Sequence, residues 1–218
     1  MHPVPVPSAA GFTIKSGWAS AVLVTAAAGL PKVEDSRRVE LSDPAIPGSR
    51  QPFHAGFGTA RDGGPELARL ITSVTHFGTR SVARLIGQWR IAGHSPRGAG
   101  LVVGSLVDPD SLTNPHIRIH ALEGRLFRRV IEDGVKRGGL SSSVWRERDL
   151  YAAATKIPGR SEQEIRDVLR ALGRTVAGSW RAEEKAAALA AWLVLAGEPS
   201  REPVRRWRAA KGAQRKQT

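Results

Sequence analysis

The residues in this sequence that are best placed to do chemistry lie in the segment NPHIRIHALEG. In it, His116, His120 and Glu123 follow at intervals of four and three residues, so a helix would present all three on one side. Two imidazoles and a carboxylate arranged in this way can bind a metal ion or act as an acid and base pair. In a plainer interpretation, His116 packs at the helix start, His120 borders the apolar side and Glu123 is solvated.

An acidic turn, VDPD, precedes this segment and follows the apolar run Leu101 to Gly104. Ligands of open α/β sheets usually bind beyond the carboxyl ends of strands. We therefore expect Asp108 to join His116, His120 and Glu123 in one cleft, as a catalytic set or as ligands of Mg²⁺, Mn²⁺ or Zn²⁺.

The segment from Ser42 to Gly64 contains three prolines and five glycines. A loop of this length inside a compact domain is usually functional or disordered. Its histidine, His54, is a further catalytic candidate, because the loop can deliver it to the same cleft. Arg61 shares this candidacy, as do Thr59 and Asp62. The alternatives are that His54 is an ordinary surface residue or that the loop docks a protein partner.

The elements that must position these residues follow from the hydrophobic spacing. Short apolar runs from Gly11 to Leu41 predict three strands joined by hairpins, and Leu101 to Gly104 predicts a strand buried on both faces. Pro65 to Ala92 has helical spacing, and Gly78 is expected to divide it into two helices. Asn114-Pro115 predicts a helix start.

Further along the chain, the pattern predicts a strand at Ser141 to Glu147 and helices at Glu162 to Leu172 and at Ala182 to Leu195. Strands that alternate with helices are typically parallel neighbours. The predicted fold class is therefore α/β, with a mixed sheet of three antiparallel strands followed by parallel strands and with helices on both faces.

Charge and composition favour some classes of function and exclude others. The 33 Lys and Arg residues outnumber the 20 acidic residues and give a formal net charge of +13, which favours a polyanionic partner such as RNA or DNA. The absence of cysteine excludes thiol catalysis, disulfides and Cys-ligated zinc. We expect no membrane span, no leader peptide and a cytoplasmic location.

Three segments are expected: a flexible arm at residues 1–8, a single domain at 9–197 and a basic tail, disordered or partly helical, at 198–218. The tail combines phosphate-neutralising charges with one aromatic stacking surface. The predicted nucleic-acid-binding residues are Arg201, Arg205, Arg206, Trp207, Arg208, Lys211, Arg215 and Lys216.

The element order, together with the opening GFTIKSGWASAVLV and the closing EEKAAALAAWLVL, resembles the ribonuclease H-like superfamily and its Holliday junction resolvases. That resemblance implies two divalent ions held by carboxylates. However, Thr13 stands where the first strand should carry aspartate, and Val103 or Gly104 stands where the middle strand should carry glutamate. Only Glu183 or Glu184 could fill a family position, so the resemblance implies the fold more than the activity.

A second resemblance is to the middle domain of archaeal and eukaryotic peptide-chain release factors. It is carried by PFHAGFGTA, which lies where those domains have a Gly-Gly-Gln tip but lacks the glutamine, and by VVGSLVDPDSL. It implies an RNA or ribosomal partner without hydrolytic release.

These observations lead to three hypotheses. The first is a ribonuclease H-like module that binds nucleic acid, with RNA or a ribosomal element favoured, and lacks the usual carboxylates. The second is a metal-dependent nuclease or phosphodiesterase that uses the Asp/His/Glu cluster. The third is a protein-interaction module.

Overall fold

A computed structural model describes residues 6–27, 29–55, 60–61, 63–155, 157 and 159–197. Its five strands form one sheet in the order β3-β2-β1-β4-β5. The strands are β1 (Val6–Lys15), β2 (Trp18–Ala27), β3 (Leu30–Glu40), β4 (His94–Val103) and β5 (Ser142–Arg146). The β1–β2 and β2–β3 pairs are antiparallel, and the β1–β4 and β4–β5 pairs are parallel. The predicted mixed α/β sheet is confirmed.

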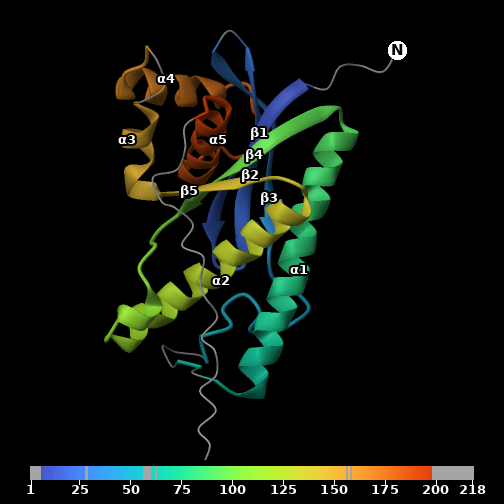
Figure 1. Ribbon diagram of the computed structural model, residues 1–218, viewed down its shortest axis with the longest axis vertical. Coiled ribbons are helices and arrows are strands. Elements are labelled where there is room, and N and C mark those ends of the chain that lie inside the picture. The colour runs from blue at the N-terminus through green and yellow to red at the C-terminus, as the bar shows by residue number, and fades with distance from the viewer. Residues whose placement is uncertain are drawn as a thin grey trace, which may run out of the picture.

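Five α-helices flank this sheet on its two faces (Figure 1). One apolar cluster joins the sheet to α3, α4 and α5, and a second joins the opposite face to α1 and α2. The helices are α1 (Gly64–Ile91), α2 (Pro115–Arg137), α3 (Leu150–Ala154), α4 (Glu162–Leu172) and α5 (Ala182–Leu195), with 3-10 turns at Pro109–Ser111 and Glu147–Asp149.

The alanine-rich helix α5 lies unusually close to the sheet because two glycines face it. Gly11 and Gly100 are register partners on β1 and β4. A Cβ at Gly11 would overlap the carbonyl of Ala187, and a Cβ at Gly100 would lie 2.7 Å from the carbonyl carbon of Ala190. The small residues on both sides therefore set the distance between helix and sheet.

Helix α1 is continuous, so the expectation that Gly78 divides it was wrong. Gly78 is buried in the middle of the helix, where a Cβ would overlap Val130 and lie 2.8 Å from the backbone oxygen of Leu41. This glycine allows α2 and the end of β3 to approach α1. The packing therefore offsets the helix propensity that glycine lacks, about 1 kcal/mol relative to alanine.

Other local predictions differ from the structure at their edges. Strand β1 begins at Val6, inside the segment 1–8 that was predicted to be a flexible arm. The short helix α3 was not predicted, since five residues are too few to show a period.

Helix α2 begins as predicted, with the Asn114 side chain accepting hydrogen bonds from the backbone N–H groups of His116 and Ile117. Among the described residues, none of the helices is both long and apolar enough to span a bilayer.

Candidate functional site

The first possible site is the place where the resolvase resemblance requires carboxylates, beside β1 and the start of α5. There the hydroxyl of Thr13 donates a hydrogen bond to the backbone oxygen of Glu183 at 2.8 Å. Thr13 pairs in register with Val102, so the neighbouring strand also brings an apolar side chain. A divalent ion needs several oxygen ligands, and this side-chain set does not fit one.

The acidic residues at the start of α5 have partners of their own. The Nζ of Lys15 lies 3.4 Å from a carboxylate oxygen of Glu183, and Ser20 donates to Glu184 at 3.4 Å. The pKa of Glu183 is lowered, first by a backbone hydrogen bond and also by the charge of Lys15. The carboxylate of Glu183 is therefore paired with a lysine of β1.

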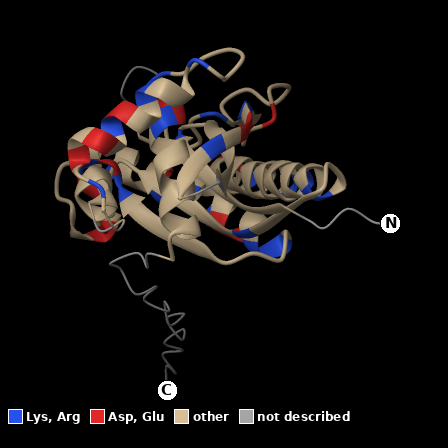
Figure 2. Cartoon of the chain, turned by 90° about the horizontal axis from the view of Figure 1, so that it is seen from above, with Lys and Arg blue, Asp and Glu red and all other residues tan. Residues whose placement is uncertain are grey.

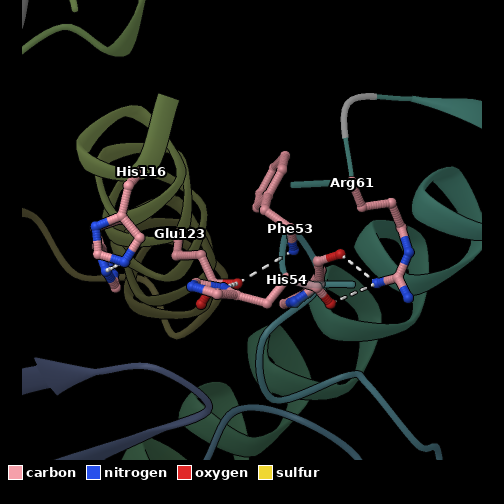
Figure 3. A network of polar contacts seen from close by, with 7 residues as sticks. Phe53, His54, Arg61, His116 and Glu123 are labelled. Carbon is pink, nitrogen blue, oxygen red and sulfur yellow. Dashed lines mark hydrogen bonds and ion pairs between the residues drawn. The ribbon is translucent and has the colours of Figure 1, made fainter. Parts of the chain in front are cut away.

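The second possible site centres on Glu123 of α2 and the loop that precedes α1 (Figure 3). The Oε1 of Glu123 accepts a hydrogen bond from the backbone N–H of Phe53 at 3.1 Å and lies 3.0 Å from Nδ1 of His54. Glu123 is only 1% exposed, so the interpretation of it as a solvated residue was wrong. The loop does deliver His54 to α2.

Arg61 stabilises the same loop through hydrogen bonds to its backbone. Its Nη1 donates to the backbone oxygens of Pro52 at 2.7 Å and His54 at 3.1 Å (Figure 3). Its Nη2 lies 3.2 Å from Glu66. Arg61 acts on the site through the backbone and does not line a shared cleft with the histidines. The other loop candidates, Thr59 and Asp62, lie outside the described residues.

Three imidazoles lie in a row beside Glu123. The Nε2 atoms of His116 and His120 are 3.3 Å apart, and the ring centroids of His54 and His120 are 5.2 Å apart. The pKa of His120 is lowered by desolvation first and then by the charges that His116 and His54 would carry. A positive charge on either neighbour therefore opposes protonation of His120.

The pKa of the buried Glu123 carboxyl is shifted in the opposite direction to that of His120, upward. Burial raises its pKa, and the hydrogen bond and charge of His54, with the Phe53 N–H, lower it in part. Its Oε2 is buried and has no hydrogen-bond partner in the described part of the chain. A carboxylate of this kind can orient the imidazole of His54 and favour a proton on its Nδ1.

The four predicted metal ligands do not converge as one set. Asp108 caps the turn at Pro109–Ser111 by accepting from the N–H of Asp110 at 3.1 Å, and it lies 3.5 Å from Arg125. Glu123 faces His54, while His116 and His120 face each other. Two imidazoles at 3.3 Å have the spacing expected of two ligands on one tetrahedral zinc. Among the described residues, no group of three or more possible ligands is present.

Two of the candidate residues line a cavity, and those of the tail lie outside the described residues. His120 and Asp108 both line a cavity of about 860 Å³ beside the end of β4, together with three arginines that were not predicted as site residues. No sequence motif marks those arginines, because only the packing of α2 against the loop brings them to a cavity. The predicted nucleic-acid-binding residues of the tail, from Arg201 to Lys216, lie outside the described residues.

Comparisons with solved structures agree with this topology. The RuvC structure of Thermus thermophilus matches with a TM-score of 0.54 at 10% identity, over 88% of this chain and 98% of that chain. RuvC of the same organism in complex with a Holliday junction substrate matches with a TM-score of 0.55, at the same identity and coverage. The yeast mitochondrial Holliday junction resolvase Ydc2 has a TM-score of 0.42 at 10% identity, over 90% of this chain and 82% of that chain.

No protein-family description matches the sequence, and a search of curated proteins also finds no match. The second predicted resemblance, to peptide-chain release factors, stays a prediction. Sheet order, helix placement and the two RuvC matches agree, and the predicted resemblance to the resolvases is confirmed at the level of the fold. The chain therefore has a ribonuclease H-like α/β fold of the kind found in Holliday junction resolvases.

Proposed function

We propose that this protein binds branched or otherwise structured nucleic acid. We further propose that the part of the sheet around Thr13, where the resolvase resemblance requires a carboxylate, does not cleave that nucleic acid. The observation that carries the proposal is a large positive charge on a resolvase-like fold. The similar RuvC structure that holds a Holliday junction favours DNA as the first ligand to test. RNA and ribosomal elements, which the sequence favoured, remain alternatives.

The positive charge of the described surface is only partly neutralised. Basic and acidic residues stand side by side along several helices (Figure 2). Helices α1 and α2 also carry exposed basic side chains with no carboxylate within 4.0 Å among the described residues: Arg69, Arg80, Arg84, Arg129, Lys136 and Arg137. Unneutralised arginines attract phosphates and release their counterions on binding. The two helices are therefore the proposed contact surface within the domain.

Binding across a salt series tests this proposal. A fluorescent four-way DNA junction, a duplex and a four-way RNA junction of matched design are titrated with the full-length protein. We expect affinity to fall steeply with salt, with a slope in log–log form of about −0.9 for each phosphate contact on duplex arms. The proposal would be overturned if the affinity for nucleic acid did not exceed the affinity for an uncharged polymer, or if it did not change with salt concentration.

A full-length variant separates the tail from the domain. Changing the seven basic residues between Arg201 and Lys216 to glutamine removes seven positive charges from a formal net charge of +13. If the tail contributes as the sequence predicts, the salt slope should fall by up to about 0.9 per lost contact. A slope that does not change assigns binding to the described domain.

A second candidate function is hydrolysis of a phosphodiester at the pair formed by His54 and Glu123. The buried carboxylate favours it, because Glu123 holds Nδ1 of His54 and leaves Nε2 free to take a proton from water. The water oxygen would bond to phosphorus as the bond to the leaving oxygen breaks, and solvent would protonate that oxygen. This is general base catalysis with an oriented imidazole.

Junction cleavage with Mg²⁺, Mn²⁺, Zn²⁺ or no added ion tests this second candidate. His54→Ala should lower the cleavage rate by about 100-fold or more, as expected for loss of a general base. Gln163→Ala, at an exposed position of α4 on the other face of the sheet, is the control and should cleave like the unchanged protein. The candidate fails if no ion supports cleavage or if His54→Ala cleaves normally.

A further inference from the structure

The cavity beside the end of β4 lies between the loop that follows this strand and one side of α2. Its volume is about 860 Å³, within the range of pockets that bind small molecules. It is separate from the pair formed by His54 and Glu123, although His120 lines it.

One wall of this cavity is apolar and open to solvent. Val107 is 51% exposed and Ile117 is 53% exposed, and they stand at its rim with the half-buried Leu106 and Leu112. Contiguous exposed apolar side chains mark a candidate surface for a ligand to cover.

The basic part of the lining lies about two to three turns farther along α2 than Ile117. Three guanidinium groups line the cavity against a single carboxylate, that of Asp108. Arg125 lies between Asp108 at 3.5 Å and Asp110 at 3.6 Å, which holds its side chain in place. The buried Nε of Arg128 makes no hydrogen bond and lies 3.7 Å from a carboxylate oxygen of Glu132, while Arg129 is exposed and has no carboxylate within 4.0 Å among the described residues. The lining therefore complements a ligand that is apolar at one end and anionic at the other.

A single nucleotide has this combination. Its base offers a flat surface to aliphatic side chains and to the imidazole of His120, and its phosphate can take a forked contact from arginine. A paired base cannot enter a pocket of this size with its partner, so the nucleotide must be unpaired or turned out of the helix. Position supports this choice, because the cavity lies beside the arginines of α2 that are proposed to contact the nucleic-acid backbone.

We propose that this cavity receives one unpaired nucleotide of the bound nucleic acid, with the base against the apolar wall and the phosphate on the arginine wall. The inference rests on the proposed function. It adds a ligand, an unpaired nucleotide, that branched or bulged strands contain and a fully paired duplex lacks. Stacking of one base contributes about 1–3 kcal/mol, which corresponds to a preference of roughly 5- to 150-fold.

Gly124 provides a sharp test, because it lines the cavity and a Cβ there would meet no atom within 4 Å. Gly124→Leu therefore fills the cavity without a clash at the backbone, and it raises helix propensity. Ala171→Leu is the matched control, since Ala171 is also helical and exposed and lies on α4, which packs on the face of the sheet opposite to α1 and α2. The probe is a duplex with one unpaired 2-aminopurine, compared with the same duplex fully paired.

The expected result is that the unchanged protein and Ala171→Leu bind the bulged probe at least about fivefold more tightly than the paired probe, with a change in 2-aminopurine fluorescence. Gly124→Leu should bind both probes equally, at the affinity of the paired one. Equal affinity for both probes in the unchanged protein, or a preference that survives Gly124→Leu, overturns the inference and leaves the proposed function intact.

Failure of the proposed function has a different signature, which is loss of affinity for every nucleic acid. The cavity is then tested alone with 2-aminopurine riboside 5′-monophosphate. Binding that Gly124→Leu abolishes supports a nucleotide pocket without a nucleic-acid surface. Displacement of a bound fluorescent fatty acid by palmitate, with no effect of the nucleotide, assigns the pocket to an apolar anion and overturns the inference.

Discussion

Gly11→Ala is expected to destabilise the protein by about 3 kcal/mol or more, the upper end of what overpacking typically costs. The new Cβ would overlap the backbone carbonyl oxygen of Ala187, whose carbon lies 2.6 Å away. Backbone atoms cannot move aside as a flexible side chain can, so α5 would have to leave the sheet. Urea unfolding followed by the fluorescence of buried tryptophans, among them Trp192, measures the effect.

Gly87→Ala is the control for Gly11→Ala. Gly87 lies in α1, and a Cβ added there would meet no atom within 4 Å, so alanine adds helix propensity without a clash. We expect it to stabilise the protein by about 0.4–1 kcal/mol. If Gly11→Ala unfolds at the same urea concentration as the unchanged protein, the close contact between α5 and the sheet is not as described.

Glu123→Ala is expected to cost about 1–3 kcal/mol of the free energy of unfolding. The substitution leaves the buried N–H of Phe53 without its acceptor and frees His54 from α2. Glu123→Gln keeps an acceptor oxygen and should cost less. Glu147→Gln changes an exposed carboxylate outside this network, and its effect should stay within about 0.5 kcal/mol.

The pH dependence of Glu123 has a defined sign. Burial raises its pKa in the folded protein above the ordinary value of 4.5. Its contribution to stability is therefore full below that ordinary value and is lost as pH rises through the folded pKa. Relative to Glu123→Gln, the unchanged protein should lose stability as pH rises from about 4.5. Urea unfolding of both proteins at several pH values measures this, and a relative gain with rising pH would contradict it.

The sequence predicted the elements well wherever the signals were local. The Asn114-Pro115 pair gave the start of α2, and α4 and the alanine-rich α5 have the predicted bounds. Gly78 was misread because a glycine in a helical pattern gives the same signal for a break and for a close helix contact. Only the positions of Val130 and Leu41 distinguish the two cases.

The candidate site was predicted in part for the same reason. The spacing of His116 and His120 on a helix sufficed to place them together, and their Nε2 atoms do meet. Asp108 was expected among them, but it belongs to a turn and contacts Arg125. A side chain that follows a strand end can turn toward several neighbours, and that of Asp108 caps its own turn by accepting from the N–H of Asp110.

By itself, the sequence determined the α/β order of elements, the antiparallel start and parallel finish of the sheet, and the excess of positive charge. These features follow from periodicity, caps and composition, which act within a few residues. Only the tertiary structure decided that Glu123 is buried against His54, 69 residues away, and that arginines of α2 line one cavity with apolar side chains of the loop after β4. Such contacts depend on how helices pack on the sheet, because burial and the distance between distant residues arise only when the chain has folded.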